Sequence, residues 1–306
     1  MYKKGKREIE IISLLWYNET GDNMDNLSGV LVINKPKGMT SFDVVKKVSK
    51  TLGVKKVGHT GTLDPLAEGV LIVCVGEATK IVELITAYDK EYIAGVKLGI
   101  ETDTYDIEGE VLQTKEVPKN LEIEKVLKSF QKTYLQEVPI YSAVKVNGKK
   151  LYEYARNQEE VELPKKEVTI KEIELLEEKE DTFTFRSKVT KGCYIRSLIH
   201  DIGADLGTCA TMTSLIRTKQ GNTRLEEAYT LEDVECGNYK MYSIEEVLDF
   251  PKVEVEEDLE FKIKNGVKTK NIWNIEDKVL FKNKQGKLLG IYEVEEGHLR
   301  VWKNFQ

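Results

Sequence analysis

Apolar and alternating runs mark several strands along the chain. Residues 29–34 form a short apolar run that ends in Lys35-Pro36-Lys37-Gly38, which is typical of a strand entering a turn. Residues 70–75 predict a buried strand, and residues 92–98 alternate in the manner of a half-buried one. We expect residues 103–111 to pair with residues 92–98.

Helical spacing is clearest in two segments. Thr40 or Ser41 can cap a first helix that Gly53 closes, and its apolar stripe consists of Phe42, Val44, Val45, Val48 and Leu52. A second helix contains Gly203 and ends at Gly207, with its apolar positions at Ile195, Leu198, Ile199, Ile202 and Leu206. Shorter helices are expected at residues 78–87, 121–131 and 151–156.

Turn signals organise the remainder of the chain. Asn147-Gly148 favours a type I′ hairpin, and strands are expected to flank residues 177–181. Residues 252–306 alternate in short strands around Asn265-Gly266 and residues 284–290, which predicts a small β-rich module. Because strands and helices mix without regular alternation, the pattern favours an α+β fold.

The composition narrows the class of protein. With 306 residues, 41% of them hydrophobic and 32% charged, the chain has the length of one large and one small globular domain. No stretch approaches the roughly 18 apolar residues of a membrane helix, and the basic start continues into Glu8 and Glu10, so we expect a cytoplasmic protein. The widely spaced cysteines and histidines predict neither a disulfide framework nor a metal site.

Charge is segregated along the chain although the net charge is −6. Residues 30–60 carry seven lysines against one anion, and residues 183–224 carry seven cations against two anions. Residues 225–260 are heavily acidic. This arrangement suits a polyanionic partner at the two basic stretches, although solvated lysines and a solvated linker would produce the same pattern.

One carboxylate stands out by its surroundings. Asp64 follows a glycine-punctuated turn and precedes Pro65, and Gly69 comes one turn later. An N-cap followed by proline at the first helical position accounts for this spacing without any chemistry. A carboxylate presented by a tight loop is equally suited to catalysis, so both interpretations stay open at this point.

Five ordered blocks resemble the bacterial TruB-type family of tRNA pseudouridine(55) synthases. The resemblance runs from about residue 27 to the C-terminus, and several separated blocks are more specific than any single one. The matching blocks are LVINKPKGMTS at 31–41, GHTGTLDPLAEG at 58–69, KEY at 90–92, YSAVK with LYEYAR between 141 and 156, and GCYIRS at 192–197.

The resemblance implies a domain organisation. It predicts a pseudouridine synthase catalytic domain at residues 24–225, with a mixed, largely antiparallel sheet and flanking helices. An acidic connector at 226–250 would lead to a PUA-like RNA-binding domain at 251–306. Residues 1–23 have no counterpart in the resemblance, so we expect a dispensable extension or a mis-assigned start.

The resemblance also implies a reaction, the isomerisation of uridine at position 55 of the tRNA T-loop. The bond between ribose C1′ and uracil N1 breaks, the uracil turns, and a bond from C1′ to C5 forms. No redox change occurs, so no cofactor is required. Asp64 would act as the nucleophile or as the proton acceptor at C2′, on a nucleotide flipped out of the T-loop.

The resemblance implies further site residues, and each has an ordinary structural explanation as well. Arg196 would pair with Asp64, Tyr92 would stack on the target base, and His59 would help to hold the extruded nucleotide. Tyr194 and Leu215 would line the pocket. Lys35, Lys145 and the two basic stretches would contact phosphates.

Two alternatives of a different class remain. The chain could be a non-catalytic tRNA-binding or folding module that uses the same surface, although Asp64, Tyr92 and Arg196 are all present. It could also be the catalytic subunit of a guide-RNA particle, which shares the fold. The short C-terminal module and the lack of basic tails favour a stand-alone monomer that acts on the tRNA T-arm without an obligatory protein partner.

Overall fold

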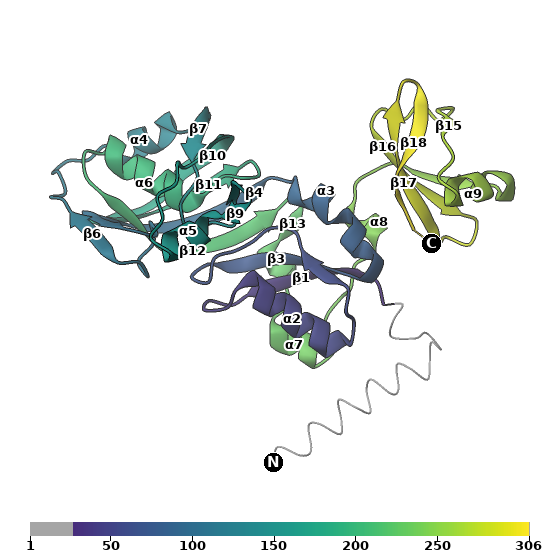
Figure 1. Ribbon diagram of the computed structural model, residues 1–306, viewed down its shortest axis with the longest axis horizontal. Helices are drawn as coiled ribbons and strands as arrows, with labels where there is room; N and C mark the ends of the chain where they lie inside the picture. The colour runs from purple at the N-terminus through teal and green to yellow at the C-terminus, as the bar shows by residue number, and fades with distance from the viewer. Residues whose placement is uncertain (1–26, 306) are drawn as a thin grey trace, which may run out of the picture.

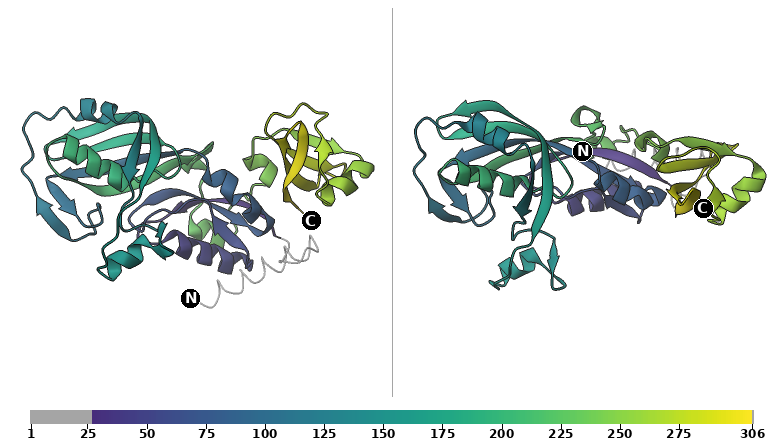
Figure 2. Two further views of the ribbon diagram at one scale, coloured as in Figure 1. Left: turned by 45° about the horizontal axis from the view of Figure 1, so that its top comes forward. Right: turned by 90° about the horizontal axis from the view of Figure 1, so that it is seen from above.

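The computed structural model describes residues 27–305, so the extension predicted at residues 1–23 lies outside the described residues. The described chain forms two parts, a large one built on a nine-stranded sheet and a small C-terminal one built on a five-stranded sheet (Figures 1 and 2). Helices of residues 27–305 are all too short or too polar to cross a bilayer.

The large sheet has the order β1-β3-β12-β4-β11-β10-β7, with β2 added to β3 and β13 added to β12. Neighbours run antiparallel except for β12 and β3, which are parallel where Ile216 faces Glu68. This confirms the mixed, largely antiparallel sheet. Its strands are β1 (Gly29–Lys35), β2 (Val57–His59), β3 (Glu68–Val75), β4 (Lys90–Leu98), β7 (Thr133–Glu137), β10 (Lys165–Lys179), β11 (Thr182–Val189), β12 (Ala210–Gln220) and β13 (Thr223–Arg224).

Helix α2 (Ser41–Leu52) follows β1 as predicted. Thr40 is its N-cap and forms a reciprocal capping box with Asp43, and Gly53 ends it in the left-handed conformation at φ 69°. One predicted position is wrong, because Phe42 is 59% exposed while the rest of the stripe is buried. Phe42 lies at the margin of the stripe, and the Lys46 ammonium lies over its ring, 4.4 Å from the ring centroid.

The other helices follow the predicted segments with small differences in bounds. Residues 78–87 divide into a 3-10 turn, η2 (Gly76–Ile81), and a short helix, α3 (Val82–Thr86). The remaining ones are α4 (Ile123–Ser129), α5 (Leu151–Arg156) and α6 (Ile195–Asp205). Asn147 and Gly148 both have positive φ, 51° and 82°, between β8 (Lys145–Val146) and β9 (Lys149–Lys150), which confirms the predicted hairpin.

The predicted pairing of residues 103–111 with residues 92–98 is wrong. Both edges of β4 are occupied, one by β11 and the other by β12. The chain instead forms a separate ribbon from β5 (Ile100–Thr102) and β6 (Val111–Thr114), with residues 103–110 as the connecting turn. Alternation predicts a strand without naming its neighbour, and here distant segments take both places.

Residues 226–250, expected as an acidic connector, lie along β1. The amide of Tyr229 donates to the Val32 carbonyl and that of Tyr242 to the Val30 carbonyl, each at 2.9 Å. The stretch contains η3 (Leu225–Glu227, which begins one residue earlier), α7 (Leu231–Glu235) and α8 (Ile244–Val247). Its backbone therefore continues the hydrogen bonding of the large sheet on the way to the C-terminal part.

The C-terminal part confirms a small β-rich module. Its sheet has the order β14-β16-β17-β18-β15, formed by β14 (Lys252–Val255), β15 (Thr269–Lys270), β16 (Lys278–Asn283), β17 (Leu288–Glu295) and β18 (His298–Asn304). The β16–β17 hairpin turns within residues 284–290, as predicted. Asn265-Gly266, however, follows the helix α9 (Glu257–Lys264) and does not join two strands. The left-handed backbone that Gly266 adopts, φ 68°, ends helices as readily as it turns hairpins.

Helix α6 packs on β12 at a distance that only glycine permits at position 203. A Cβ atom there would lie 2.6 Å from both the Cβ and the backbone nitrogen of Ala210. This close approach sets the height of α6 above the sheet, and with it the position of the side chains in the first turn of the helix.

We expect Gly203→Ala to lower the free energy of unfolding by about 1–3 kcal/mol, because overpacking outweighs the higher helix propensity of alanine. Urea unfolding measures the change. Gly58→Ala is the matched control, since its added Cβ would meet only Val82 at 3.9 Å. Equal stability of Gly203→Ala and wild type would contradict the packing argument.

Candidate active site

Asp64 lies in the loop between β2 and β3, and the start of α2 holds this loop from one side. The Ser41 hydroxyl accepts a hydrogen bond from the Leu63 amide at 2.8 Å and donates one to the Leu63 carbonyl at 3.2 Å. The Gly38 amide donates to the Pro65 carbonyl at 2.8 Å. The residues on both sides of Asp64 are therefore tied to the turn that follows β1.

Lys35, the last residue of β1, supports the same loop. Its side chain is fully buried, and its ammonium donates to the carbonyls of Met39 at 2.6 Å, Pro36 at 2.9 Å and Pro65 at 3.5 Å. Burial lowers the pKa of Lys35 to about 8. A phosphate cannot reach this ammonium, so the phosphate contact expected for Lys35 is wrong, and the residue supports the loop instead.

Arg217 of β12 braces the loop from the other side. Its Nε donates to the Val70 carbonyl at 2.6 Å and its Nη2 to the Gly61 carbonyl at 3.1 Å, with 1% of the residue exposed. A Cβ at Gly69 would lie 2.3 Å from the Arg217 carbonyl oxygen. Sequence reasoning counted Arg217 only as one cation of a basic stretch. Its spacing of two from Leu215 on a strand was the signal that it shares the buried face.

Arg196 joins α6 to Asp64. Its Nε donates to Oδ2 of Asp64 at 2.9 Å and its Nη2 to Oδ1 at 3.2 Å, which is a bidentate ion pair. The remaining donors reach the carbonyls of Thr104 at 2.9 Å and Tyr141 at 3.0 Å, and Asp106 lies 4.0 Å away. The Arg196 side chain is 6% exposed and that of Asp64 34%. Both carboxylate oxygens are thus fixed in direction while one side of Asp64 stays open.

Two tyrosines lie within electrostatic reach of Asp64. Tyr92, on β4, is buried; burial raises its pKa, the charge of Arg217 opposes this, and the charge of Asp64 adds to it. Tyr194 is the N-cap of α6, where its backbone exchanges hydrogen bonds of 2.8 and 3.1 Å with the Gln136 amide. Burial raises the pKa of Tyr194 as well. Both phenols therefore stay protonated near neutral pH.

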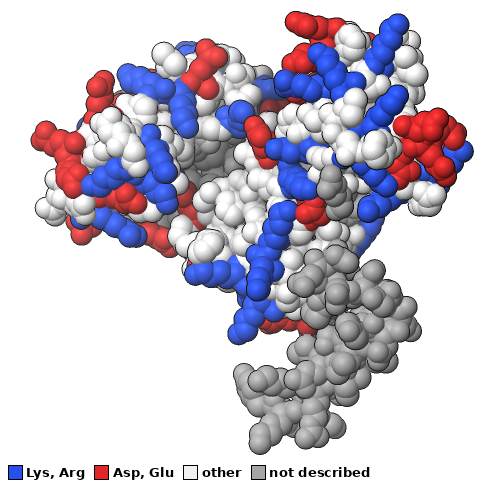
Figure 3. Space-filling model, turned by 45° about the vertical axis from the view of Figure 1, so that its right-hand side comes forward, with Lys and Arg blue, Asp and Glu red and all other residues white. Residues whose placement is uncertain are grey.

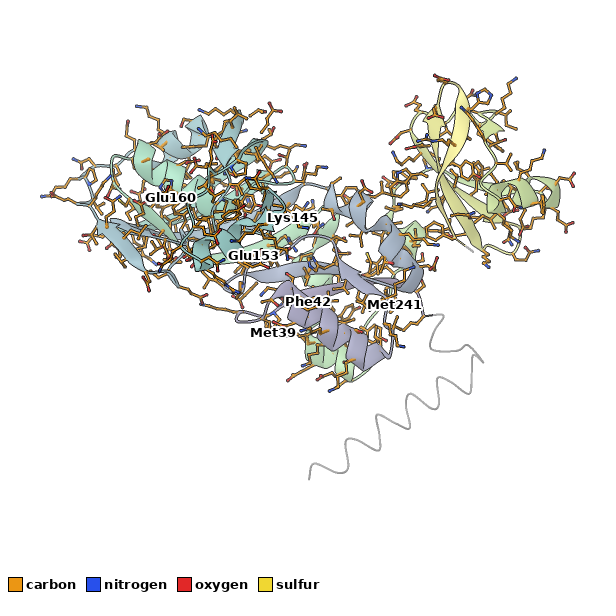
Figure 4. All side chains as sticks on the ribbon, in the orientation of Figure 1. Met39, Phe42, Lys145, Glu153, Glu160 and Met241 are labelled. Carbon is orange, nitrogen blue, oxygen red and sulfur yellow. The ribbon has the colours of Figure 1, made fainter. Side chains whose placement is uncertain are left out.

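The remaining predicted site residues are Leu215, His59 and Lys145, and their surroundings differ. Leu215 belongs to the same core cluster as Leu63 and Tyr92. His59 ends β2, its Nδ1 accepts from the Gly61 amide at 3.3 Å, and burial lowers its pKa. Lys145, labelled in Figure 4, lies on the β8–β9 hairpin and is exposed.

The surface around the two parts is strongly charged. On the face shown in Figure 3, Lys and Arg side chains form a band across the middle of the molecule, and acidic side chains gather toward its outer ends. The arrangement as a whole combines a rigid carboxylate, two aromatic rings and a basic surface. Such a set can act on the sugar of a nucleotide, whose base is flat and whose phosphate backbone is anionic.

The fold is shared with chains of solved structures. A chain of the structure entitled "Crystal Structure of a Cbf5-Nop10-Gar1 Complex" matches at a TM-score of 0.68 and 26% identity, over 91% of this chain and 85% of that chain. Two family models also match, TruB family pseudouridylate synthase (N terminal domain) at residues 49–195 and tRNA pseudouridylate synthase B C-terminal domain at residues 196–251. Fold and site together define a pseudouridylate synthase.

Curated relatives narrow this class. A protein of Fusobacterium nucleatum named tRNA pseudouridine synthase B is 46% identical over 280 residues, which are 89% of this chain and 98% of that protein. One of the same name from Caldanaerobacter subterraneus is 42% identical over 285 residues, 92% of this chain and 100% of that protein. The chain belongs to the TruB family of pseudouridylate synthases.

We expect Ser41→Ala to slow pseudouridine formation about tenfold, because the buried Leu63 amide beside Asp64 loses its acceptor, a loss of about 1–3 kcal/mol. Single-turnover rates measure the change. Ser49→Ala is the matched control, since it removes a hydroxyl from the same helix, where Ser49 bonds the Val54 carbonyl at 2.7 Å, away from the loop. Equal rates for the two variants would count against a role of Ser41 in positioning Asp64.

Proposed function

We propose that this enzyme isomerises uridine 55 in the T-loop of tRNA. The observation that carries the proposal is the bidentate Arg196–Asp64 pair in a loop braced by Ser41, Lys35 and Arg217. Relatives named tRNA pseudouridine synthase B, at 42–48% identity, support an enzyme that forms pseudouridine in tRNA.

Asp64 acts on the ribose of the target nucleotide in this proposal, as the nucleophile or as the proton acceptor at C2′. Because Arg196 occupies one side of both carboxylate oxygens, the reacting lone pair points to the open side of Asp64. The bond from C1′ to N1 breaks, the retained uracil turns, and C5 bonds to C1′, which releases Asp64 where it had acted as the nucleophile. C5 then loses its proton and N1 gains one. The product is an isomer of the substrate, so the reaction needs no redox cofactor.

Binding of the nucleotide falls to the side chains around Asp64. A uridine inside the T-loop has to be flipped out to reach the carboxylate, and an aromatic ring can replace the stacking that it loses. We assign that ring to Tyr92, the walls of the pocket to Tyr194 and Leu215, and a holding contact to His59. The protonated phenols of Tyr92 and Tyr194 can donate hydrogen bonds to the base.

The rest of the tRNA would meet the exposed cations. Lys145 and the exposed members of the basic stretches are assigned to phosphates, in keeping with the basic band in Figure 3. We assign catalysis to residues 24–225 and a grip on the acceptor-side stem to a PUA-like domain at 251–306, joined by the connector at 226–250. In this proposal the protein is a cytoplasmic monomer without an obligatory protein partner.

We expect Asp64→Asn to abolish pseudouridine formation, by more than about 1000-fold, and to leave tRNA binding intact, because the amide is isosteric but neither a nucleophile nor a base. Carbodiimide mapping of a tRNA transcript before and after incubation measures product, and filter binding measures affinity. Asp205→Asn, at the exposed end of α6, is the matched control. Unchanged product formation by Asp64→Asn would overturn this assignment.

A guide-RNA particle subunit is the second candidate, because one of the matching solved structures is entitled "Crystal Structure of a Cbf5-Nop10-Gar1 Complex". We expect the purified chain to modify a bare T-arm hairpin at a rate within about tenfold of full tRNA, since the target loop carries the phosphates nearest the site. Carbodiimide mapping of the hairpin measures this. Activity that appears only after a guide RNA and partner proteins are added would favour the second candidate.

A further inference from the structure

A cluster of titratable side chains lies one helical turn beyond Arg196, outside the site described above. His200 follows Arg196 by four residues on α6, so the two side chains lie on the same face of the helix. The His200 ring stacks on Tyr105 with centroids 4.3 Å apart and 27° between the planes. Its Nε2 lies 3.4 Å from Glu101 Oε1, and its Nδ1 lies 3.7 Å from Asp201 Oδ1.

The segment 101–106 is attached to α6 at two places. Glu101 of β5 and the ring of Tyr105 contact the His200 ring. The Thr104 carbonyl accepts a hydrogen bond from Arg196, and Asp106 lies 4.0 Å from the same guanidinium. The segment therefore connects the His200 side chain to the residue that holds Asp64.

Tyr105 lies at the centre of this connection in a conformation that is unfavourable for its residue type. Its φ of 61° is in the left-handed region, which a bulky side chain adopts only where the surroundings hold it. The peptide plane before Tyr105 carries the Thr104 carbonyl, so this backbone angle helps to direct that oxygen toward Arg196. Stacking on His200 and a 3.0 Å hydrogen bond from the Met212 amide to the Tyr105 carbonyl hold the residue.

We propose that His200, in its imidazolium form, is a positioning residue for pseudouridine formation: it holds Tyr105 and Glu101, and through the Thr104 carbonyl it keeps Arg196 aligned on Asp64. The inference rests on the proposed function. His200 touches neither the substrate nor Asp64, so its effect falls on the rate of the reaction and not on tRNA affinity.

The charged groups around His200 determine how pH acts on it. Asp201 faces the ring from α6 and Glu101 from β5, and Tyr105 covers it from the turn. Behind Asp201, the Tyr134 hydroxyl of β7 donates a hydrogen bond to its carboxylate at 3.3 Å. Behind Glu101, the Cys209 thiol lies 3.6 Å from its carboxylate, and the Gln113 amide of β6 donates a hydrogen bond to it. Burial and the nearby charge of Glu137 raise the pKa of the Tyr105 phenol.

The Asp201 carboxylate beside Nδ1 and the charge of Glu101 raise the pKa of His200 above its ordinary 6.5, against the effect of burial. A raised pKa means that the contribution of the imidazolium is complete below 6.5 and is lost as pH rises through the pKa of the folded protein. Deprotonation leaves Glu101 and Asp201 facing a neutral ring, so the attachment of the segment to α6 weakens. The rate should therefore decline at alkaline pH.

The test is a comparison of pH profiles. Single-turnover rates on a tRNA transcript are measured from pH 6 to 9 for wild type, His200→Gln and His200→Arg. Wild type should exceed His200→Gln about fivefold at pH 6, which is the size expected for one ordinary hydrogen bond, and the ratio should approach one at pH 9. His200→Arg keeps a cation that can stack on Tyr105, so it should match the wild-type rate at pH 6 and exceed it toward pH 9, whereas the titration of Lys35 affects both proteins equally.

Controls separate positioning from general structure and from the function itself. Lys128→Gln, which removes the exposed 2.6 Å pair with Glu124 on α4, should leave the profile unchanged. Affinity for tRNA should stay within about twofold in all variants. A ratio of wild type to His200→Gln that is constant across pH, or no difference at all, would overturn the inference while leaving the proposed function in place. Absence of product with wild type would instead refute the proposed function.

If His200→Gln does not fold, His200→Arg and Glu101→Gln decide the question. Glu101→Gln removes the carboxylate that faces the ring from β5, so the alkaline decline should move to lower pH. If the alkaline decline in rate is the same as in wild type in both variants, the role of His200 is overturned.

Discussion

The buried guanidinium of Arg196 is the interaction on which the rest of the site depends. A cation in the interior requires a partner for each of its donors, because an unpaired buried charge is strongly destabilising. Arg196 makes four hydrogen bonds, two to the Asp64 carboxylate and one each to the carbonyls of Thr104 and Tyr141, from three loops that are distant in the sequence. The first turn of α6 therefore fixes where these loops meet, and Gly203 lets that helix lie close enough to β12.

The same rule explains the support behind the Asp64 loop. Lys35 and Arg217 are buried, and each donates to one carbonyl of the loop, Pro65 or Gly61, and to carbonyls of the segments beside it. A carbonyl carries no full charge, so burial dominates and the pKa of Lys35 falls to about 8. These two cations therefore stabilise the protein itself, whereas Lys145 is exposed.

Local signals predicted much of the fold. The capped helix α2, the buried strand β3 and the Asn147-Gly148 hairpin each depend on neighbours within a few residues, and all three are present. The errors concern what a local signal cannot contain. Phe42 has the apolar character of its stripe but lies on the solvent side, and Asn265-Gly266 has a left-handed preference that serves a helix end as well as a hairpin.

For the site, the sequence by itself determined which residue types occur and in which local element each stands, and the family resemblance singled out Asp64 and Arg196. Only the tertiary structure decided which groups meet. Asp64 and Arg196 are 132 residues apart, and Arg196 bonds Thr104 across 92 residues. Periodicity shows that Lys35 and Arg217 could be buried, but whether a lysine faces solvent or a loop carbonyl depends on what distant chain covers it. The physical reason is that hydrogen-bond satisfaction in the interior is a property of the packed whole.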